Sequence, residues 1–152
     1  MTIRHATRED IGALGAIAEE AGLFPADMLP DMISPAFEGA DDVWLVAERD
    51  GAPDGFAFAR PEQMTDRVWN LLAIGVHPSA RGNGLGRRLL DAVEAGLPDA
   101  RMIIIETTQL PEQATARALY ADAGYRHSAG IPDFFADGED KIVFVKRVEA
   151  RA

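Results

Sequence analysis

The chain has 152 residues, 47% of them hydrophobic and 26% charged, which suits one globular domain spanning residues 1–152. Cysteine is absent, which excludes disulfides, thiolate metal ligands and a cysteine nucleophile. The net charge of −10 disfavours nucleic-acid binding and is compatible with a cationic or amine-bearing substrate. No apolar run could span a membrane and no signal-peptide core is present, so we expect a cytoplasmic protein.

The first part of the chain predicts one strand and two helices. Residues 2–5 suit a short strand, and Thr7 suits the N-cap of a helix that ends at Gly22. A second, short helix begins near Pro25, and Pro30 is a point where it could break.

Three strands are predicted next. Residues 43–48 and 56–60 form a hairpin, with turn chemistry at Asp50–Gly51 and Pro53–Gly55. Residues 67–76 form a long strand, whose continuous apolar end indicates a buried central position.

Helices and strands then alternate. A helix from Gly84 ends at the stop signal Gly96–Pro98. A β-branched run predicts a buried strand over 102–106, and Gly124 closes a helix over 112–123.

The C-terminal part predicts strands over 125–128 and 142–148, with a loop over 131–140 that carries two aromatics among four acids. The resulting order is strand–helix–helix–strand–strand–strand–helix–strand–helix–strand–strand. This order indicates a mixed α/β class in one layered domain.

Three glycines alternate between the long strand and the helix that follows it, at positions 82, 84 and 86. Glycine adopts backbone angles that a Cβ forbids, and the first amides of a helix lack internal partners at its positive dipole end. The stretch therefore predicts an anion site suited to a pyrophosphate. Three cations accompany the glycines: Arg81, Arg87 and Arg88.

The spacing of the glycines excludes two common phosphate-binding motifs. A dinucleotide fingerprint would need glycine at position 87 or 89, and a P-loop would need a lysine. The pattern Arg81-x-x-Gly84-x-Gly86 instead resembles the acyl-CoA pyrophosphate loop of the GNAT family of N-acetyltransferases. The lead-in Val76-His77-Pro78 and the following Leu85 match that family as well.

A second motif strengthens the resemblance. Ala116–Tyr120, followed by Gly124-Tyr125, is similar to a helix motif of the same family, and the element order is also the family's. The resemblance covers Thr2 to Val148. It implies a mixed, mostly antiparallel sheet with splayed central strands, flanked by helices.

The activity implied by the resemblance is attack of a primary amine on the thioester carbonyl of acetyl-CoA, the acyl donor. This reaction needs a neutral amine, an oxyanion donor and an acid for the departing thiolate. We expect direct transfer to the amine of a small molecule, an amino acid or a peptide terminus.

The catalytic roles follow from the motif positions. Tyr120 corresponds to the family's acid, and its phenol is protonated at neutral pH. The strand position where the family often carries Glu is Asn70, which cannot take a proton. Glu106, at the end of an apolar strand, is the substitute base. A water chain, Asp133 or Asp137 are alternatives.

The resemblance also implies binding residues. Main-chain groups near Ile74 and Val76 would bind pantetheine and the acetyl oxygen, and Gly75 favours splaying of their strand. The expected coenzyme contacts are Ile74, Gly75, Val76, Arg81, Gly82, Asn83, Gly84, Leu85, Gly86, Arg87 and Gln113. The expected acceptor contacts are Phe24, Met28, Asn70 and Phe134.

Other functions stay open at this point. The chain could be an acyl-CoA-binding module without catalysis, or a toxin that acetylates aminoacyl-tRNA, which the acidic charge disfavours. The histidines His5, His77 and His127 lack metal-ligand spacing, so we expect structural roles and no metal. A homodimer is possible by analogy.

Overall fold

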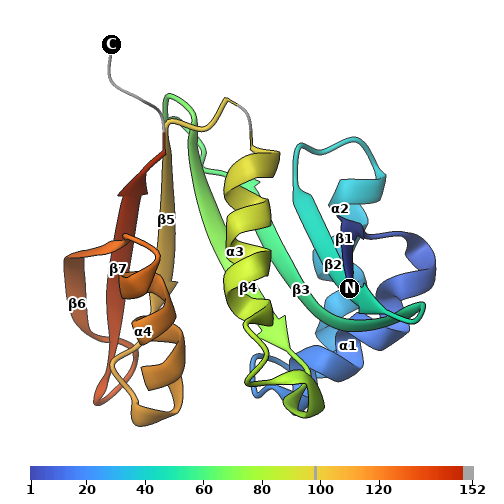
Figure 1. Ribbon diagram of the computed structural model, residues 1–152. Helices are drawn as coiled ribbons and strands as arrows, with labels where there is room; N and C mark the ends of the chain where they lie inside the picture. Colours follow the sequence, from blue (N-terminus) through green and yellow to red (C-terminus); the bar gives the residue numbers. More distant parts are fainter. Residues whose placement is uncertain (98, 149–152) are drawn as a thin grey trace. The chain divides into compact units, whose positions relative to one another are not determined.

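The computed structural model describes residues 1–97 and 99–148 (Figure 1). Its contacts divide the chain into two compact units, which are described one after the other. The first unit contains Met1–Arg60 and Leu72–Pro98, and the second contains Pro61–Leu71 and Asp99–Ala152. Strand β4 (Val68–Val76) has residues in both units.

The first unit has the strand order β1-β2-β3-β4, with antiparallel pairing of β1 with β2 and of β2 with β3. Besides β4, its strands and α-helices are β1 (Thr2–His5), α1 (Ile11–Glu20), α2 (Leu29–Phe37), β2 (Val43–Arg49), β3 (Ala52–Pro61) and α3 (Leu85–Gly96). Short 3₁₀ turns precede α1, α2 and α3.

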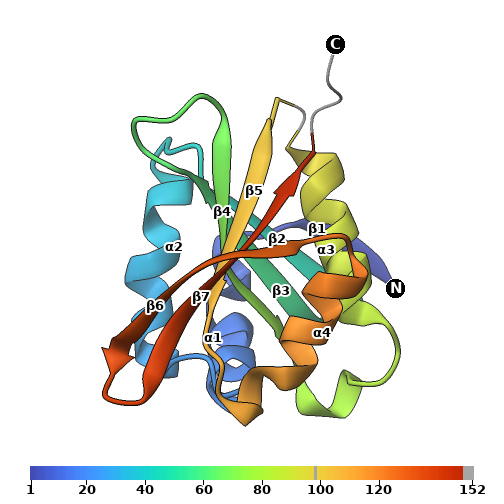
Figure 2. The same cartoon turned by 90° about the vertical axis from the view of Figure 1, so that its left-hand side faces the viewer.

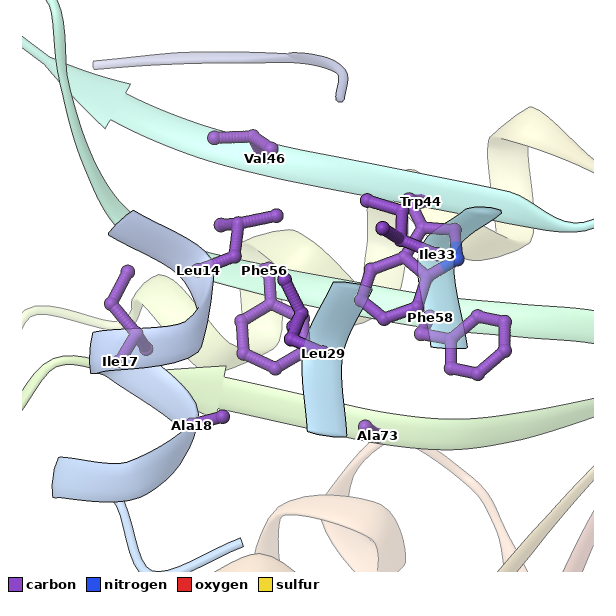
Figure 3. Close-up of a cluster of buried hydrophobic side chains, with 10 residues drawn as sticks. All are labelled: Leu14, Ile17, Ala18, Leu29, Ile33, Trp44, Val46, Phe56, Phe58 and Ala73. Atoms are coloured by element: carbon purple, nitrogen blue, oxygen red, sulfur yellow. The ribbon is translucent and has the colours of Figure 1, made fainter. Parts of the chain in front are cut away.

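The core of the first unit lies between helices α1 and α2 and the strands β2 and β3 (Figure 3). Leu14 from α1 and Leu29 from α2 point toward the aromatic rings of the strands. The apolar residues of these two helices recur at helical spacing, so they lie on one face of each helix. Trp44 stacks on Phe58 with ring centroids 4.1 Å apart. Alternate β3 residues face opposite ways, so Gly55 meets α3 instead.

The second unit contains the order β4-β5-β7-β6. Its further elements are β5 (Met102–Thr107), α4 (Ala114–Asp122), β6 (Arg126–Ala136) and β7 (Glu139–Arg147). The start of β4 pairs parallel to β5, while β5–β7 and β6–β7 are antiparallel. Figure 2 shows β6 and β7 as one hairpin.

The element order and the mostly antiparallel α/β fold predicted from the sequence are confirmed. The predicted caps are also present. Thr7 forms a capping box with Asp10, and Gly124 follows α4 with a φ of +94°. Among the described residues, no helix is long and apolar enough to cross a membrane.

The predicted loop over 131–140 is wrong. β6 continues to Ala136 and β7 begins at Glu139, so only a tight turn separates them. Every residue of β6 is exposed on this edge strand, so the sequence shows no apolar alternation. The pairing is irregular between Ile131 and Ala136, which accommodates Pro132 without a ladder donor.

Two further boundaries differ from prediction. The hairpin turn is confined to Asp50–Gly51, because β3 already starts at Ala52. The register shifts opposite Ala47 and Glu48 and leaves Asp54 of β3 without a pairing partner in β2, so Pro53–Gly55 forms an irregularity of the strand and not a second turn. Pro30 does not break a helix but lies in the first turn of α2, where no amide donor is needed. Pro98, predicted to follow the helix stop, lies outside the described residues.

Candidate functional site

The glycine loop before α3 adopts a conformation that requires glycine. Gly82 has a φ of +83°, and Gly84, the N-cap of α3, has a φ of +73°. A Cβ at either position would meet no atom within 4 Å. The glycines are therefore needed for backbone conformation, and the space in front of them is open.

The amides of this loop are unpaired. Within the described residues, no protein oxygen accepts from the N–H groups of residues 82–87, and the first helical bond runs from Arg88 N to Gly84 O at 3.2 Å. These donors point from the N-terminus of a helix of 12 residues, where the dipole adds positive potential. The arrangement is chemically suited to bind a diphosphate.

The arginines beside the loop differ in their partners. The Nε of Arg87 lies 3.1 Å from Oδ1 of Asp91, one turn along α3. Arg81 and Arg88 are exposed and form no ion pair with any described residue. Both are therefore available to an anionic ligand, whereas Arg87 has a competing carboxylate.

Contacts on both sides hold the loop in place. The backbone amide of His77 donates to Asp54 O at 2.7 Å. The Nδ1 of the His77 ring accepts from the backbone N–H of Ser79 at 3.1 Å. Its other ring nitrogen faces Glu20. His77 therefore has a structural role. At the loop's end, Asn83 Nδ2 donates to Ala80 O at 3.3 Å.

The part of β4 that leads into the loop is closely packed. A Cβ on Gly75 would lie 2.9 Å from Leu23 Cδ1 and 3.0 Å from Phe56 Cε1. Gly75 therefore makes room for side chains, a role that the sequence did not indicate. Ile74 and Val76 lie beyond the β4–β5 ladder, which joins Val68–Leu71 to Met102–Ile105.

Tyr120 lies on α4 in the second unit and is only 5% exposed. Its ring meets those of Tyr125 and Phe144 edge-on, with centroids 6.4 and 5.8 Å away. Burial raises the pKa of Tyr120 to about 12, because the phenolate would lose its hydration. None of the described residues hydrogen-bonds its hydroxyl, so the phenol proton has no protein acceptor.

Three of the predicted site residues, Asn70, Glu106 and Phe134, belong to one cluster in the second unit. Asn70 Nδ2 donates to Glu106 Oε1 at 3.2 Å and to Glu62 Oε2 at 3.3 Å. The other oxygen of Glu106 lies 2.6 Å from Lys141 Nζ, which also sits 4.4 Å from the ring centroid of Phe134. We call these five residues the β4–β5 polar cluster.

Lys141 was not predicted as a site residue, and the sequence indicates Glu62 only as part of an acceptor loop over 62–66. Glu62 precedes β4 at the edge of a turn, and Lys141 follows the acid-rich stretch that resembled a loop. Neither position carries a motif. Lys141 could have been found only by knowing that it lies opposite Ile131 in the β6–β7 hairpin.

The remaining predicted residues differ in their surroundings. Phe24 packs against the core of the first unit, while Met28 is half-exposed. Gln113 is the last residue of a 3₁₀ turn before α4 and makes no capping bond. Asp133 accepts from Gly138 N at 2.7 Å, so its carboxylate stabilises the hairpin turn.

Comparison with known proteins identifies the class. The family model described as the acetyltransferase (GNAT) domain matches residues 40–127, more than half of the chain. The protein therefore belongs to the GNAT acetyltransferase family, and it is an acyltransferase.

Particular relatives agree with this assignment. An uncharacterized N-acetyltransferase of Methanocaldococcus jannaschii is 26% identical over 150 residues, which are 97% of this chain and 92% of the relative. The L-2,4-diaminobutyric acid acetyltransferase of Streptomyces avermitilis is 36% identical over 86 residues, 54% of this chain and 46% of that protein. A solved structure from Desulfovibrio desulfuricans, described as GNAT family, has a TM-score of 0.89 and 25% identity, covering 97% of this chain and 99% of that one.

Proposed function

We propose that residues 1–152 act as one N-acetyltransferase domain, which moves the acetyl group of acetyl-CoA directly to a primary amine. The acceptor is a small molecule, an amino acid or a peptide terminus. The observation that carries this proposal is the row of unpaired amides at residues 82–87, aligned with the N-terminus of α3. Family membership supplies the reaction class.

The coenzyme's diphosphate binds these amides in this proposal, with Arg81 and Arg88 as additional cationic partners. Main-chain groups of Ile74 to Val76 contact the pantetheine arm and the acetyl oxygen. The side-chain amide of Gln113 adds a further contact with coenzyme A. The remaining contacts are those of the loop itself: Gly82, Asn83, Gly84, Leu85, Gly86 and Arg87.

The reaction proceeds by addition and elimination. The neutral amine forms a C–N bond to the acetyl carbon, the C–S bond then breaks, and the thiolate takes a proton from the Tyr120 hydroxyl. The high pKa of Tyr120 keeps the phenol protonated before this step. Glu106 takes a proton from the ammonium before the attack, which gives the neutral amine. After the C–S bond breaks, the extra proton of the amide nitrogen returns to the Tyr120 phenolate, and Glu106 releases its proton to solvent.

Glu106 is the proposed proton acceptor, and its partners set a condition on this role. Lys141 and Asn70 already occupy both of its oxygens. Each oxygen keeps a second lone pair, so the amine must approach beside these two donors. Glu106→Gln should lower kcat about 100-fold at pH 7, with a smaller loss at higher pH where more amine is neutral. An unchanged kcat would instead favour a water chain as the proton acceptor.

A second candidate is a module that binds acyl-CoA without catalysis. Two observations favour this alternative. Asn70 carries an amide where the family often carries a carboxylate, and Glu106 is already bonded to Lys141 and Asn70. The two functions differ in one measurement, because only the enzyme releases free thiol from acetyl-CoA when an amine is present.

The test combines binding and turnover. Calorimetry should show uptake of coenzyme A by the folded protein, and a thiol-release screen should find activity with amines, amino acids or polyamines. Uptake without any thiol release would leave the binding module, and absence of uptake would overturn both functions. Light scattering in the same buffer tests the accompanying proposal of a homodimer.

A further inference from the structure

The β4–β5 polar cluster carries more negative than positive charge. Glu62 and Glu106 both accept from one amide nitrogen of Asn70, but Lys141 pairs only with Glu106. Glu62 is half-buried and forms no ion pair with any described residue. One carboxylate of the cluster therefore lacks a cation.

Asn70 adds an unpaired acceptor to the same place. The residue is 5% exposed, and its Oδ1 has no hydrogen-bond partner in the described chain. Turning the amide over would not help, because the oxygen would then face two carboxylates. A buried acceptor without a protein donor is costly, so a ligand that donates hydrogen bonds to this oxygen would stabilise the site.

A ligand that suits this place carries positive charge and several hydrogen-bond donors. A primary ammonium has both, since it presents three N–H donors around one charge. One donor would satisfy the carboxylate of Glu62 and another the Oδ1 of Asn70. Lys141 already shows that this cluster accepts an ammonium, held between a carboxylate and the Phe134 ring.

We propose that Glu62 and Asn70 bind the protonated second amino group of a diamine acceptor, a class that includes diamino acids. This inference rests on the proposed acetyltransferase function. The anchored nitrogen is not the one that is acetylated, because a carboxylate favours the charged ammonium and so suppresses its nucleophilicity. The acceptor therefore needs one amine that stays charged and another that becomes neutral.

Lys141 competes with the substrate in this arrangement. Oδ1 of Asn70 is closed to solvent, so side chains must move before an ammonium reaches it. Lys141 is the one long, flexible cation of the cluster, held by a single ion pair and a ring contact. Its removal leaves two carboxylates without a cation, which should strengthen diamine binding.

The experiment compares 1,3-diaminopropane with n-butylamine, in which a methyl group replaces one amine. Steady-state thiol release and calorimetry with each amine are measured for the wild type, Glu62→Gln and Lys141→Met. Glu62→Gln should raise the KM for the diamine about tenfold and change that for n-butylamine by less than about twofold. Lys141→Met should lower the KM for the diamine several-fold.

Controls separate this inference from the proposed function. Glu9→Gln removes the same charge from an exposed position in the first unit and should leave both KM values unchanged. Coenzyme A binding is measured for every variant. Equal KM values for the two amines, or an equal effect of Glu62→Gln on both, would overturn the diamine site while the transferase stands. Loss of coenzyme A uptake or of all thiol release in the wild type would overturn the transferase itself.

Discussion

At the scale of single residues, Tyr120 gives the clearest prediction. Tyr120→Phe removes only the hydroxyl, which no described residue hydrogen-bonds, so the fold should be kept. We expect kcat to fall about 100-fold because the thiolate loses its acid, while the Kd for coenzyme A changes less than about twofold. Stopped-flow thiol release and calorimetry measure the two quantities. A parallel loss of coenzyme A binding would show that Tyr120 acts by positioning the ligand.

The same residue predicts a pH dependence of stability. Burial raises the pKa of Tyr120 to about 12 in the folded chain, against about 10 in an unfolded one. Between these values the unfolded state has lost the proton and the folded state has kept it, so stability falls as pH rises. The loss should approach about 1.4 kcal/mol per pH unit.

Urea unfolding between pH 9 and 12, compared between the wild type and Tyr120→Phe, isolates this contribution. The variant has no phenol at this position, so its free energy of unfolding should decline less steeply above pH 10. Identical slopes in the two proteins would show that the Tyr120 hydroxyl is hydrated in the folded state.

At the scale of elements, the glycine loop and α3 form one segment. Gly84 and Gly96 in this segment both have open space for a Cβ, but only Gly84 has a positive φ. Gly84→Ala places a side chain at a φ of +73°, although no atom lies within 4 Å of the new Cβ. The strain of about 1 kcal/mol should rotate the loop amides and weaken coenzyme A binding up to about tenfold. Gly96→Ala is the matched control, since this helical position has open space and a φ that suits alanine.

Calorimetry and thermal unfolding distinguish these variants. Gly96→Ala should keep the affinity for coenzyme A and raise stability by about 0.5 kcal/mol. Gly84→Ala should lower both affinity and stability. If Gly84→Ala bound coenzyme A as well as the wild type, the amides of residues 82–87 would not be the diphosphate site.

At the scale of the whole molecule, local chemistry was predictable and distant pairing was not. The glycine loop, the cap at Thr7 and the stop at Gly124 depend on nearby residues, so the sequence contains the whole signal. The continuation of β6 to Ala136 was missed because an exposed edge strand has no apolar alternation. The contact between Asn70 and Glu106 joins residues 36 positions apart, and periodicity carries no information about it.

The net charge of −10 links these sites to solution conditions. A dication is attracted by the whole acidic surface as well as by Glu62, and salt screens that attraction over about 10 Å at 0.1 M. Coenzyme A meets the opposite field, but its proposed contacts include short-range amide dipoles that salt screens less.

Raising NaCl from about 50 to about 300 mM should therefore increase the KM for 1,3-diaminopropane several-fold and change the Kd for coenzyme A less than about twofold. Initial-rate kinetics and calorimetry across this range are the measurements, with n-butylamine as the singly charged control. If salt affected coenzyme A as strongly as the diamine, the arginines rather than the amides would dominate diphosphate binding.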